Sequence, residues 1–222
     1  MNTALIIPIY NEKKSIKKIV EQAKKQVKRV IVVDNNSEDG TLKILKKLNI
    51  IFVSHVHNIG KSNSLKTGCK IAINLNADYI AMMDGDGQHL IEDLKNIIIQ
   101  IKKTKVDMVI GTRSNKKMPL INNIGTLIIS NLVKFLFKKK LNDVQSGLRV
   151  FKSSVYKKII WRSDGSAHYF ADAEMTVNAI KNNLKIIEWP IKTKFFKKHQ
   201  FKGMNLFQGV YLLICLIIWK IS

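Results

Sequence analysis

The sequence predicts an α/β fold with a mainly parallel sheet flanked by helices. Short apolar runs, typical of buried strands, alternate along the first half of the chain with longer stretches of helical period. Polar and acidic residues directly follow most of these runs. Such alternation favours a parallel sheet covered on both faces, with ligands received at the carboxyl ends of its strands.

The first half of the chain contains the strands and helices of this alternation. Strands are expected at residues 5–9, 30–33, 50–53, 79–83 and 108–110. Helices are indicated where apolar residues recur at three- and four-residue spacing, as in Ile16, Ile19, Val20 and Ala23. These helices are expected at 15–27, 41–48, 61–75 and 91–103.

The second half adds helices and returning strands to the same domain. An apolar helix is expected at 120–137, followed by a strand-like segment after residues 143–149. A later helix carries Asp172 and Glu174, and residues 184–190 lead into an extended pair. A single domain over residues 1–203, with an apolar C-terminal helix at 204–222, is the simplest organisation.

The apolar tail from Leu206 to Trp219 is too short for a helix that spans a bilayer, which takes ~20 residues. Lysines precede it, as in an amphipathic segment that lies on an anionic membrane face. Tyr211, Trp219 and Lys220 suit such an interface. A buried C-terminal helix is the alternative.

The net charge of +22 indicates either anionic partners or a biased composition. Nucleic acid, acidic lipid headgroups and phosphorylated substrates are the partner classes that fit, and charge alone does not separate them. Cys69 and Cys215 lie far apart without metal-ligand spacing and are expected to be reduced. The N-terminus enters a strand at once, which predicts a non-secreted protein.

Asp84-Gly85-Asp86 follows a predicted strand and places two carboxylates on a tight turn. Carboxylate oxygens bind hard divalent cations, and Gln88 offers a further oxygen. Such an ion usually completes its shell with substrate phosphates, so the motif suits a nucleoside diphosphate with Mg²⁺ or Mn²⁺. Lys61 at a glycine-bearing helix start also suits a diphosphate, although the spacing is not that of a P-loop. An Asp-Gly turn without a metal remains the alternative.

Further polar residues follow the first two predicted strands. Pro8 fixes the exit of the first strand and leaves Tyr10 and Glu12 available to contact a ring or a ribose. Asp34 or Asn35 at the end of the second strand can read a nucleobase edge. The residues after them form a turn and a helix cap.

These motifs together resemble those of the family-2 glycosyltransferases, which have a GT-A-like nucleotide-sugar fold. Within that family they are most similar to the polyprenyl-phosphate group that includes the dolichyl-phosphate mannose synthases. The resemblance covers nearly the whole chain. The segments that carry it are, in order, residues 8–12, 33–41, 84–89, 111–113, 145–149 and 172–175.

The resemblance implies how the donor is held. Pro8, Tyr10, Glu12, Asp34 and Asn35 would hold the nucleoside. Asp84 would support the donor, and Asp86 with Gln88 would hold the metal beside the diphosphate. Many relatives carry a second Asp where Asn35 stands, so the preference for uridine or guanosine is open. The expected donor-binding residues, with Lys61 added, are Pro8, Tyr10, Glu12, Asp34, Asn35, Lys61, Asp84, Asp86 and Gln88.

The resemblance also implies an acceptor site. Arg113 and Arg149 are similar to the family's cations for the acceptor phosphate, a role that the planar guanidinium fits through bidentate pairing. The expected acceptor-binding residues are Arg113, Ser146, Arg149, Glu174 and Lys202. The expected catalytic residues are Asp86, Arg113 and Arg149.

An acceptor phosphate is already a nucleophile, so an inverting in-line attack on the sugar carbon needs no strong base. The predicted function is sugar transfer from a nucleoside-diphosphate sugar to a polyprenyl phosphate (dolichyl or undecaprenyl), by a cytoplasmic enzyme peripheral at the inner face of a membrane. One alternative is a saccharide acceptor in cell-surface glycan synthesis, which would need a carboxylate base. A remote alternative is a basic nucleic-acid-binding protein, against which the sequence shows no nucleic-acid module.

Overall fold

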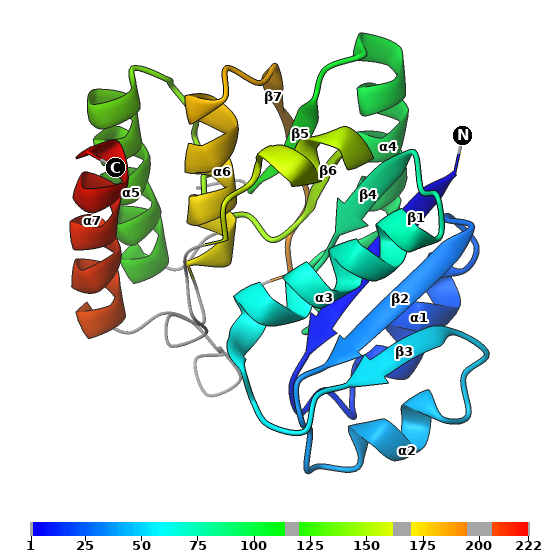
Figure 1. Ribbon diagram of the computed structural model, residues 1–222. Helices are drawn as coiled ribbons and strands as arrows, with labels where there is room; N and C mark the ends of the chain where they lie inside the picture. Colours follow the sequence, from blue (N-terminus) through cyan, green and yellow to red (C-terminus); the bar gives the residue numbers. More distant parts are fainter. Residues whose placement is uncertain (1, 114–119, 162–169, 195–205, 222) are drawn as a thin grey trace.

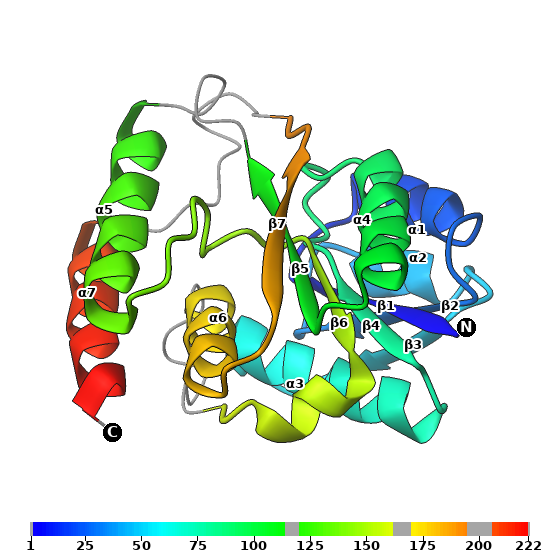
Figure 2. The ribbon, with the colours of Figure 1, turned by 90° about the horizontal axis from the view of Figure 1, so that it is seen from above.

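The computed structural model describes residues 2–113, 120–161, 170–194 and 206–221. Its centre is a seven-stranded sheet of order β3-β2-β1-β4-β6-β5-β7, with helices on both faces (Figure 1 and Figure 2). The strands are β1 Thr3–Ile9, β2 Arg29–Asp34, β3 Ile51–Ser54, β4 Tyr79–Met82, β5 Met108–Arg113, β6 Arg149–Lys152 and β7 Ile186–Ile191.

All strand pairs are parallel except those of β6, which runs antiparallel to both β4 and β5. The predicted, mainly parallel sheet is therefore confirmed. The prediction that Gly111, Thr112 and Arg113 follow the fifth strand was wrong, because they are its last residues and pair with β7. Of the extended pair expected after residue 184, β7 is the strand that the structure describes.

The predicted helices are present, with small differences at their ends. The first two are shorter than predicted, since turns replace their last residues. A short 3₁₀ helix at Ser153–Lys158 was not predicted. The α-helices are α1 Ile16–Ala23, α2 Thr41–Leu45, α3 Gly60–Asn74, α4 Ile91–Thr104, α5 Leu120–Phe137, α6 Ala171–Lys181 and α7 Leu206–Ile221.

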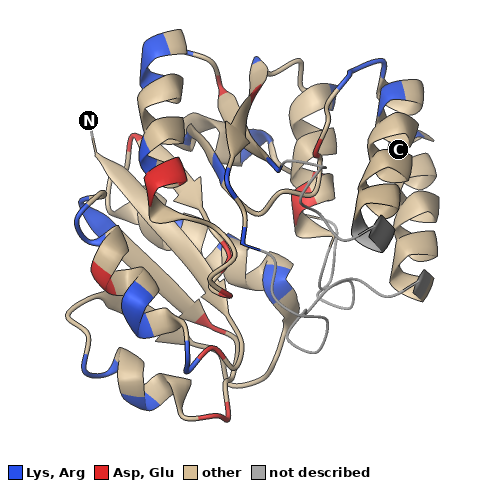
Figure 3. Cartoon of the chain, turned by 180° about the vertical axis from the view of Figure 1, so that it is seen from behind, with Lys and Arg blue, Asp and Glu red and all other residues tan. Residues whose placement is uncertain are grey.

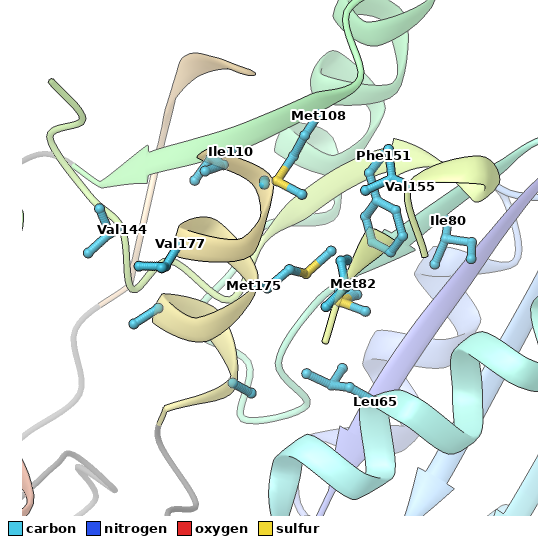
Figure 4. Close-up of a cluster of buried hydrophobic side chains, with 14 of the residues drawn as sticks. Leu65, Ile80, Met82, Met108, Ile110, Val144, Phe151, Val155, Met175 and Val177 are labelled. Atoms are coloured by element: carbon cyan, nitrogen blue, oxygen red, sulfur yellow. The ribbon is translucent and has the colours of Figure 1, made fainter. Parts of the chain in front are cut away.

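Two apolar cores lie on opposite faces of the sheet. Because side chains alternate along a strand, Ile6 of β1 enters one core while Leu5 and Ile7 enter the other. The first core joins the strands to α3, α5, α6 and α7, and the second joins them to α1 and α4. Figure 4 shows part of the first core, where strand residues such as Met108 and Phe151 lie close to Met175 of α6.

Helix α7 packs beside α5 at the side of the molecule away from β3 (Figure 1). Its residues Leu212, Leu216 and Trp219 are buried and belong to the first core. The helix is thus part of the same packed unit as the sheet, and only one of its faces is exposed. No helix within the described ranges is both long and apolar enough to cross a bilayer.

The close contact between α3 and β1 depends on a glycine. A Cβ added at Gly68 would lie 2.4 Å from Cγ2 of Ile6, whereas one added at Gly125 of α5 would meet nothing within 4 Å. We expect Gly68→Ala to lower the free energy of unfolding by about 1–3 kcal/mol through overpacking. Gly125→Ala should raise it by about 0.5–1 kcal/mol, because alanine favours the helix. Urea unfolding of both variants checks this, and a gain in stability at Gly68 would contradict the close packing.

Candidate active site

The turn after β4 carries the two carboxylates that the sequence predicted. Gly87 has a φ of 81°, the left-handed region that glycine adopts without strain. The backbone N–H and the side-chain amide of Gln88 both donate to Asp86, at 2.9 and 2.8 Å. A Cβ at Gly85 would lie 2.3 Å from Cγ2 of Ile9, so the turn packs directly on the end of β1.

The electrostatics at Asp86 favour a cation. Burial and the negative charge of nearby Asp84 raise the pKa of Asp86, and Glu12 adds to the effect. A divalent ion would relieve this repulsion, and the oxygens of Asp86 and Gln88 are the donors that Mg²⁺ and Mn²⁺ accept. The described residues contain no group of three or more His, Cys, Asp or Glu side chains that could enclose a metal. An ion here would complete its shell with water or with oxygens of a bound substrate.

Lys61, in the first turn of α3, joins two carboxylates. Its ammonium lies 2.6 Å from Oδ1 of Asp84 and 2.7 Å from Oδ2 of Asp172, the second residue of α6. Burial alone would lower the pKa of Lys61, but the charges of Asp172 and Asp84 raise it, so the side chain stays protonated. Burial opposes ionisation of Asp84 as well, yet Lys61 and His89 hold its pKa below the usual value.

Arg149 lies inside the protein and not at its surface. The guanidinium is fully buried and donates to the backbone oxygens of Ser146 and Asp172 and to the hydroxyl of Thr176, at 2.5, 2.9 and 3.2 Å. It also lies 3.5 Å from the carboxylate of Asp172. Burial lowers its pKa. In this conformation Arg149 connects the β6 loop to α6, and a contact of Arg149 with the acceptor phosphate stays a prediction.

Arg113 ends β5 and is the arginine that reaches the site. Its side chain is 19% exposed and pairs with the buried carboxylate of Asp143. Nε lies 2.7 Å from Oδ2 and Nη2 lies 2.8 Å from Oδ1, a side-on pair of parallel hydrogen bonds. Burial opposes its charge, but the charge of Asp143 raises the pKa of Arg113, and Asp84 and Asp172 contribute further.

The loop between Asp143 and β6 approaches the carboxylate turn very closely. A Cβ at Gly147 would lie 2.1 Å from Oδ2 of Asp84, so glycine is needed for the contact. Three cations and three carboxylates form a charged cluster at this edge, and each cation pairs with at least one carboxylate. The residues of the cluster are Lys61, Asp84, Arg113, Asp143, Arg149 and Asp172. Ser146 is buried beside it, and no described residue hydrogen-bonds its hydroxyl.

The end of β2 carries Asp34 and Asn35, and both side chains make hydrogen bonds to the neighbouring loops. Asp34 is fully buried; its Oδ2 accepts from Ser54 and from the N–H of Ser37, whereas no described residue hydrogen-bonds its Oδ1. The Asn35 carbonyl accepts from the N–H of Ile59 at 3.0 Å and lies 3.2 Å from Nδ1 of His55. Its amide donates to the side chain of Asn58, so Asn35 orders the loop that leads into α3.

The residues after β1 reach the same edge. Pro8 is buried within the strand and Tyr10 is exposed. The hydroxyl of Ser15 lies 2.8 Å from the carboxylate of Glu12 and 2.7 Å from the carbonyl oxygen of Gly85. Through this contact the first loop and the carboxylate turn are held together.

Most of the predicted site residues thus gather at the carboxyl edge of the sheet, as parallel strands require. Glu174 is different: it is fully buried, and its charge acts on the thiol of Cys215 in α7. Lys202 lies outside the described residues. The residues that sequence reasoning missed are Asp143, Asp172 and His89, which is buried with Nε2 3.8 Å from Asp84. All three lie in or beside motifs that were recognised, but only their spatial partners reveal their part in the site.

Two of the relatives match this chain over nearly all of its length. The model of glycosyl transferase family 2 matches residues 4–160. A UDP-N-acetylglucosamine–dolichyl-phosphate N-acetylglucosaminyltransferase of Methanococcus voltae is 32% identical, over 98% of this chain and 96% of its own. An uncharacterised protein of Methanocaldococcus jannaschii is 34% identical, over 98% and 91%.

A solved structure has the same architecture. Glucosyl-3-phosphoglycerate synthase of Mycobacterium tuberculosis, in complex with Mn²⁺, uridine diphosphate and glucosyl-3-phosphoglycerate, superimposes with a TM-score of 0.74 at 13% identity, over 98% of this chain and 78% of that one. This likeness concerns the fold, and it confirms the predicted GT-A-like architecture. With the family model covering most of the sheet and its carboxylate turn, the chain belongs to glycosyl transferase family 2.

Proposed function

We propose that this protein transfers a sugar from a nucleoside-diphosphate sugar to a polyprenyl phosphate, with inversion at the sugar carbon. The observation that carries the proposal is the placement of Arg113 near the Asp84–Asp86 turn, at the carboxyl edge of the sheet, where parallel sheets of this kind receive their ligands. The Methanococcus voltae relative, named for dolichyl phosphate as its acceptor, supports the lipid acceptor.

For the donor, Asp34 would accept an N–H from the base through its unpartnered Oδ1. Uracil and guanine both offer such a group, so the residue alone does not select between them. Tyr10 and Glu12 lie at the same edge and would contact the nucleoside, while Pro8 and Asn35 shape the pocket from within. Lys61 would position the carboxylate of Asp84 next to the diphosphate of the donor.

Asp86 and Gln88 would bind a divalent cation, Mg²⁺ or Mn²⁺. Such an ion supplies charge neutralisation for a nucleoside-diphosphate leaving group. The protein itself places two carboxylates on a turn that β1 and Lys61 hold in position. Asp84 pairs with Lys61, whereas burial and the charge of Asp84 raise the pKa of Asp86.

For the acceptor, Arg113 would bind the lipid phosphate. Charge-assisted hydrogen bonds to phosphate suit a guanidinium that is fixed in direction. The carboxylate of Asp172 is engaged by Lys61 and lies near Arg149, so it is poorly placed to take a proton from a sugar hydroxyl. This favours a phosphate acceptor, which needs no base, over a saccharide acceptor.

Helix α7 would hold the enzyme at the membrane surface, on the cytoplasmic side. Apart from Lys220, its exposed positions are apolar and recur at helical spacing: Phe207, Val210, Tyr211, Ile214, Ile217, Ile218 and Ile221. Helix α5 lies beside it, and in Figure 3 the pair is almost entirely tan, with blue where α5 ends. A groove of about 490 Å³ opens there, lined by Asn131, Lys134, Phe135, Lys138 and Lys140, and suits anionic headgroups.

The test of the function is sugar transfer in vitro. The protein is incubated with a panel of UDP- and GDP-sugars, Mn²⁺ or Mg²⁺, and a polyprenyl phosphate. We expect labelled product in the organic phase, abolished by a chelator. Donor turnover with only water-soluble product would show that the acceptor is a saccharide. Nucleic-acid binding without any nucleotide-sugar binding would overturn the proposal.

Asp86→Ala tests the metal turn. Loss of a ligand that stabilises the leaving group by several kcal/mol should lower the transfer rate about 100-fold or more. Calorimetry should show weaker donor binding in the presence of Mn²⁺. Glu21→Ala removes an exposed carboxylate of α1 that pairs only with Lys17 in the described structure, and serves as the control. Equal activity of the two variants would exclude Asp86 as a metal ligand.

Ile214→Glu tests membrane docking. A charge in the centre of the exposed face of α7 should weaken binding to phosphatidylglycerol vesicles about tenfold, because one buried Ile contributes about 1.5–3 kcal/mol. Ile99→Glu is the matched control, since Ile99 on α4 is equally exposed, at 48% against 49%. Cosedimentation measures both. Unchanged binding of the α7 variant would assign this face to another partner.

A further inference from the structure

We infer that Asp143 is a positioning residue that orients Arg113 toward the phosphate of the acceptor. The inference rests on the proposed function, and it assigns a role to a residue with no place in the predicted site. Asp143 does not face the open edge, because its carboxylate is fully buried. It acts through Arg113.

The geometry of the pair leaves a defined edge of the guanidinium for a ligand. Asp143 accepts from Nε and Nη2 of Arg113, and its Oδ2 also lies 3.2 Å from the Arg113 backbone nitrogen, which donates to it. A guanidinium has five N–H donors. Those on Nη1 and the second on Nη2 are not used by Asp143, and the side chain is 19% exposed, so we assign these donors to the acceptor phosphate.

Asp143 is itself fixed by a second carboxylate, in β7. Glu188 accepts from the backbone N–H of Asp143 at 3.0 Å and from the backbone and side-chain amides of Asn142, both at 2.8 Å. The hydroxyl of Ser130 in α5 donates to the carbonyl of Asn142 at 3.1 Å. Hydrogen bonds from β7 and α5 therefore set the place of Asp143, and Asp143 sets the direction of Arg113.

The charge balance explains why direction matters here. Arg113 is neutralised by Asp143 and also lies in the field of Asp84 and Asp172. Net positive charge is therefore a weak source of phosphate affinity at this point. Binding depends instead on N–H donors aimed at the phosphate, and a misplacement of about 1 Å in such a contact can cost about 100-fold in rate. Lysine cannot replace Arg113, because an ammonium has no second edge to present while it pairs side-on.

The experiment measures acceptor and donor parameters of Asp143→Asn in the full chain. We expect kcat/KM for polyprenyl phosphate to fall about 10- to 100-fold, while the dissociation constant of the donor with Mn²⁺ stays within about twofold of that of the unaltered protein. Asp107→Asn is the matched control: Asp107 accepts from Lys152 at 2.9 Å and from the backbone N–H of Lys185, next to the start of β5. This control should leave both parameters within about twofold.

A double-mutant cycle separates positioning from a structural role. In an Arg113→Ala background, Asp143→Asn should cause no further loss of kcat/KM beyond about twofold, since its effect passes through Arg113. A full additional loss in that background, or a parallel loss of donor affinity, would show that Asp143 only maintains the fold. Glu188→Gln provides a second variant, with a smaller loss of the same acceptor-selective kind expected, should Asp143→Asn not fold.

The outcomes distinguish the inference from the function on which it rests. If the unaltered protein makes no lipid-linked product, the proposed function fails and the role of Asp143 fails with it. If the unaltered protein is active and Asp143→Asn is equally active, the positioning role alone is overturned.

Discussion

The arrangement of the site depends on one ammonium, that of the partly buried Lys61, held between Asp84 and Asp172. The two carboxylates come from the turn after β4 and from the start of α6, and without a cation between them they would repel each other. Asp172 is buried, so loss of Lys61 would leave its charge with less compensation. Lys61 therefore fixes how close α6 and the β6 loop come to the carboxylate turn.

The rest of the cluster follows from that contact. Because α6 is drawn to the sheet edge, its Asp172 carbonyl and Thr176 hydroxyl accept from Arg149 inside the protein. Arg149 in turn holds the carbonyl of Ser146, and Gly147 then touches Asp84. The two arginines of the recognised motifs therefore lie in different environments. Arg149 is buried and holds the loop before β6, whereas Arg113 is partly exposed at the carboxyl edge of the sheet.

The helices and strands could be predicted because the spacing of apolar residues reflects which face of each element is buried. The gathering of the polar residues at one edge could be predicted because the carboxyl ends of parallel strands lie together. It could not predict which side chains pair across that edge. The pairing of Arg113 with Asp143 requires β6 to insert antiparallel between β4 and β5, and nothing local indicates such an insertion. The contacts of Asn35 with Asn58 and Ile59 likewise come from another loop. Residue type suggested a base reader, and these contacts add a supporting role at the start of α3 that the sequence did not indicate.

The tail illustrates a second limit of periodicity. A helix that is apolar all round gives no preferred face, so the sequence left a buried helix and a membrane-surface helix as competing alternatives. In the structure one face of α7 is buried, as the first alternative expects, and the other face is exposed, as the membrane-surface proposal requires. Leu212, Leu216 and Trp219 enter the core, and the opposite face exposes residues such as Ile214 and Ile218. Water is a poor solvent for so continuous an apolar surface, whereas the interface of an anionic bilayer satisfies both this face and the lysines at the end of α5. An acceptor that resides in the bilayer and an enzyme that lies on it would then meet at the membrane surface.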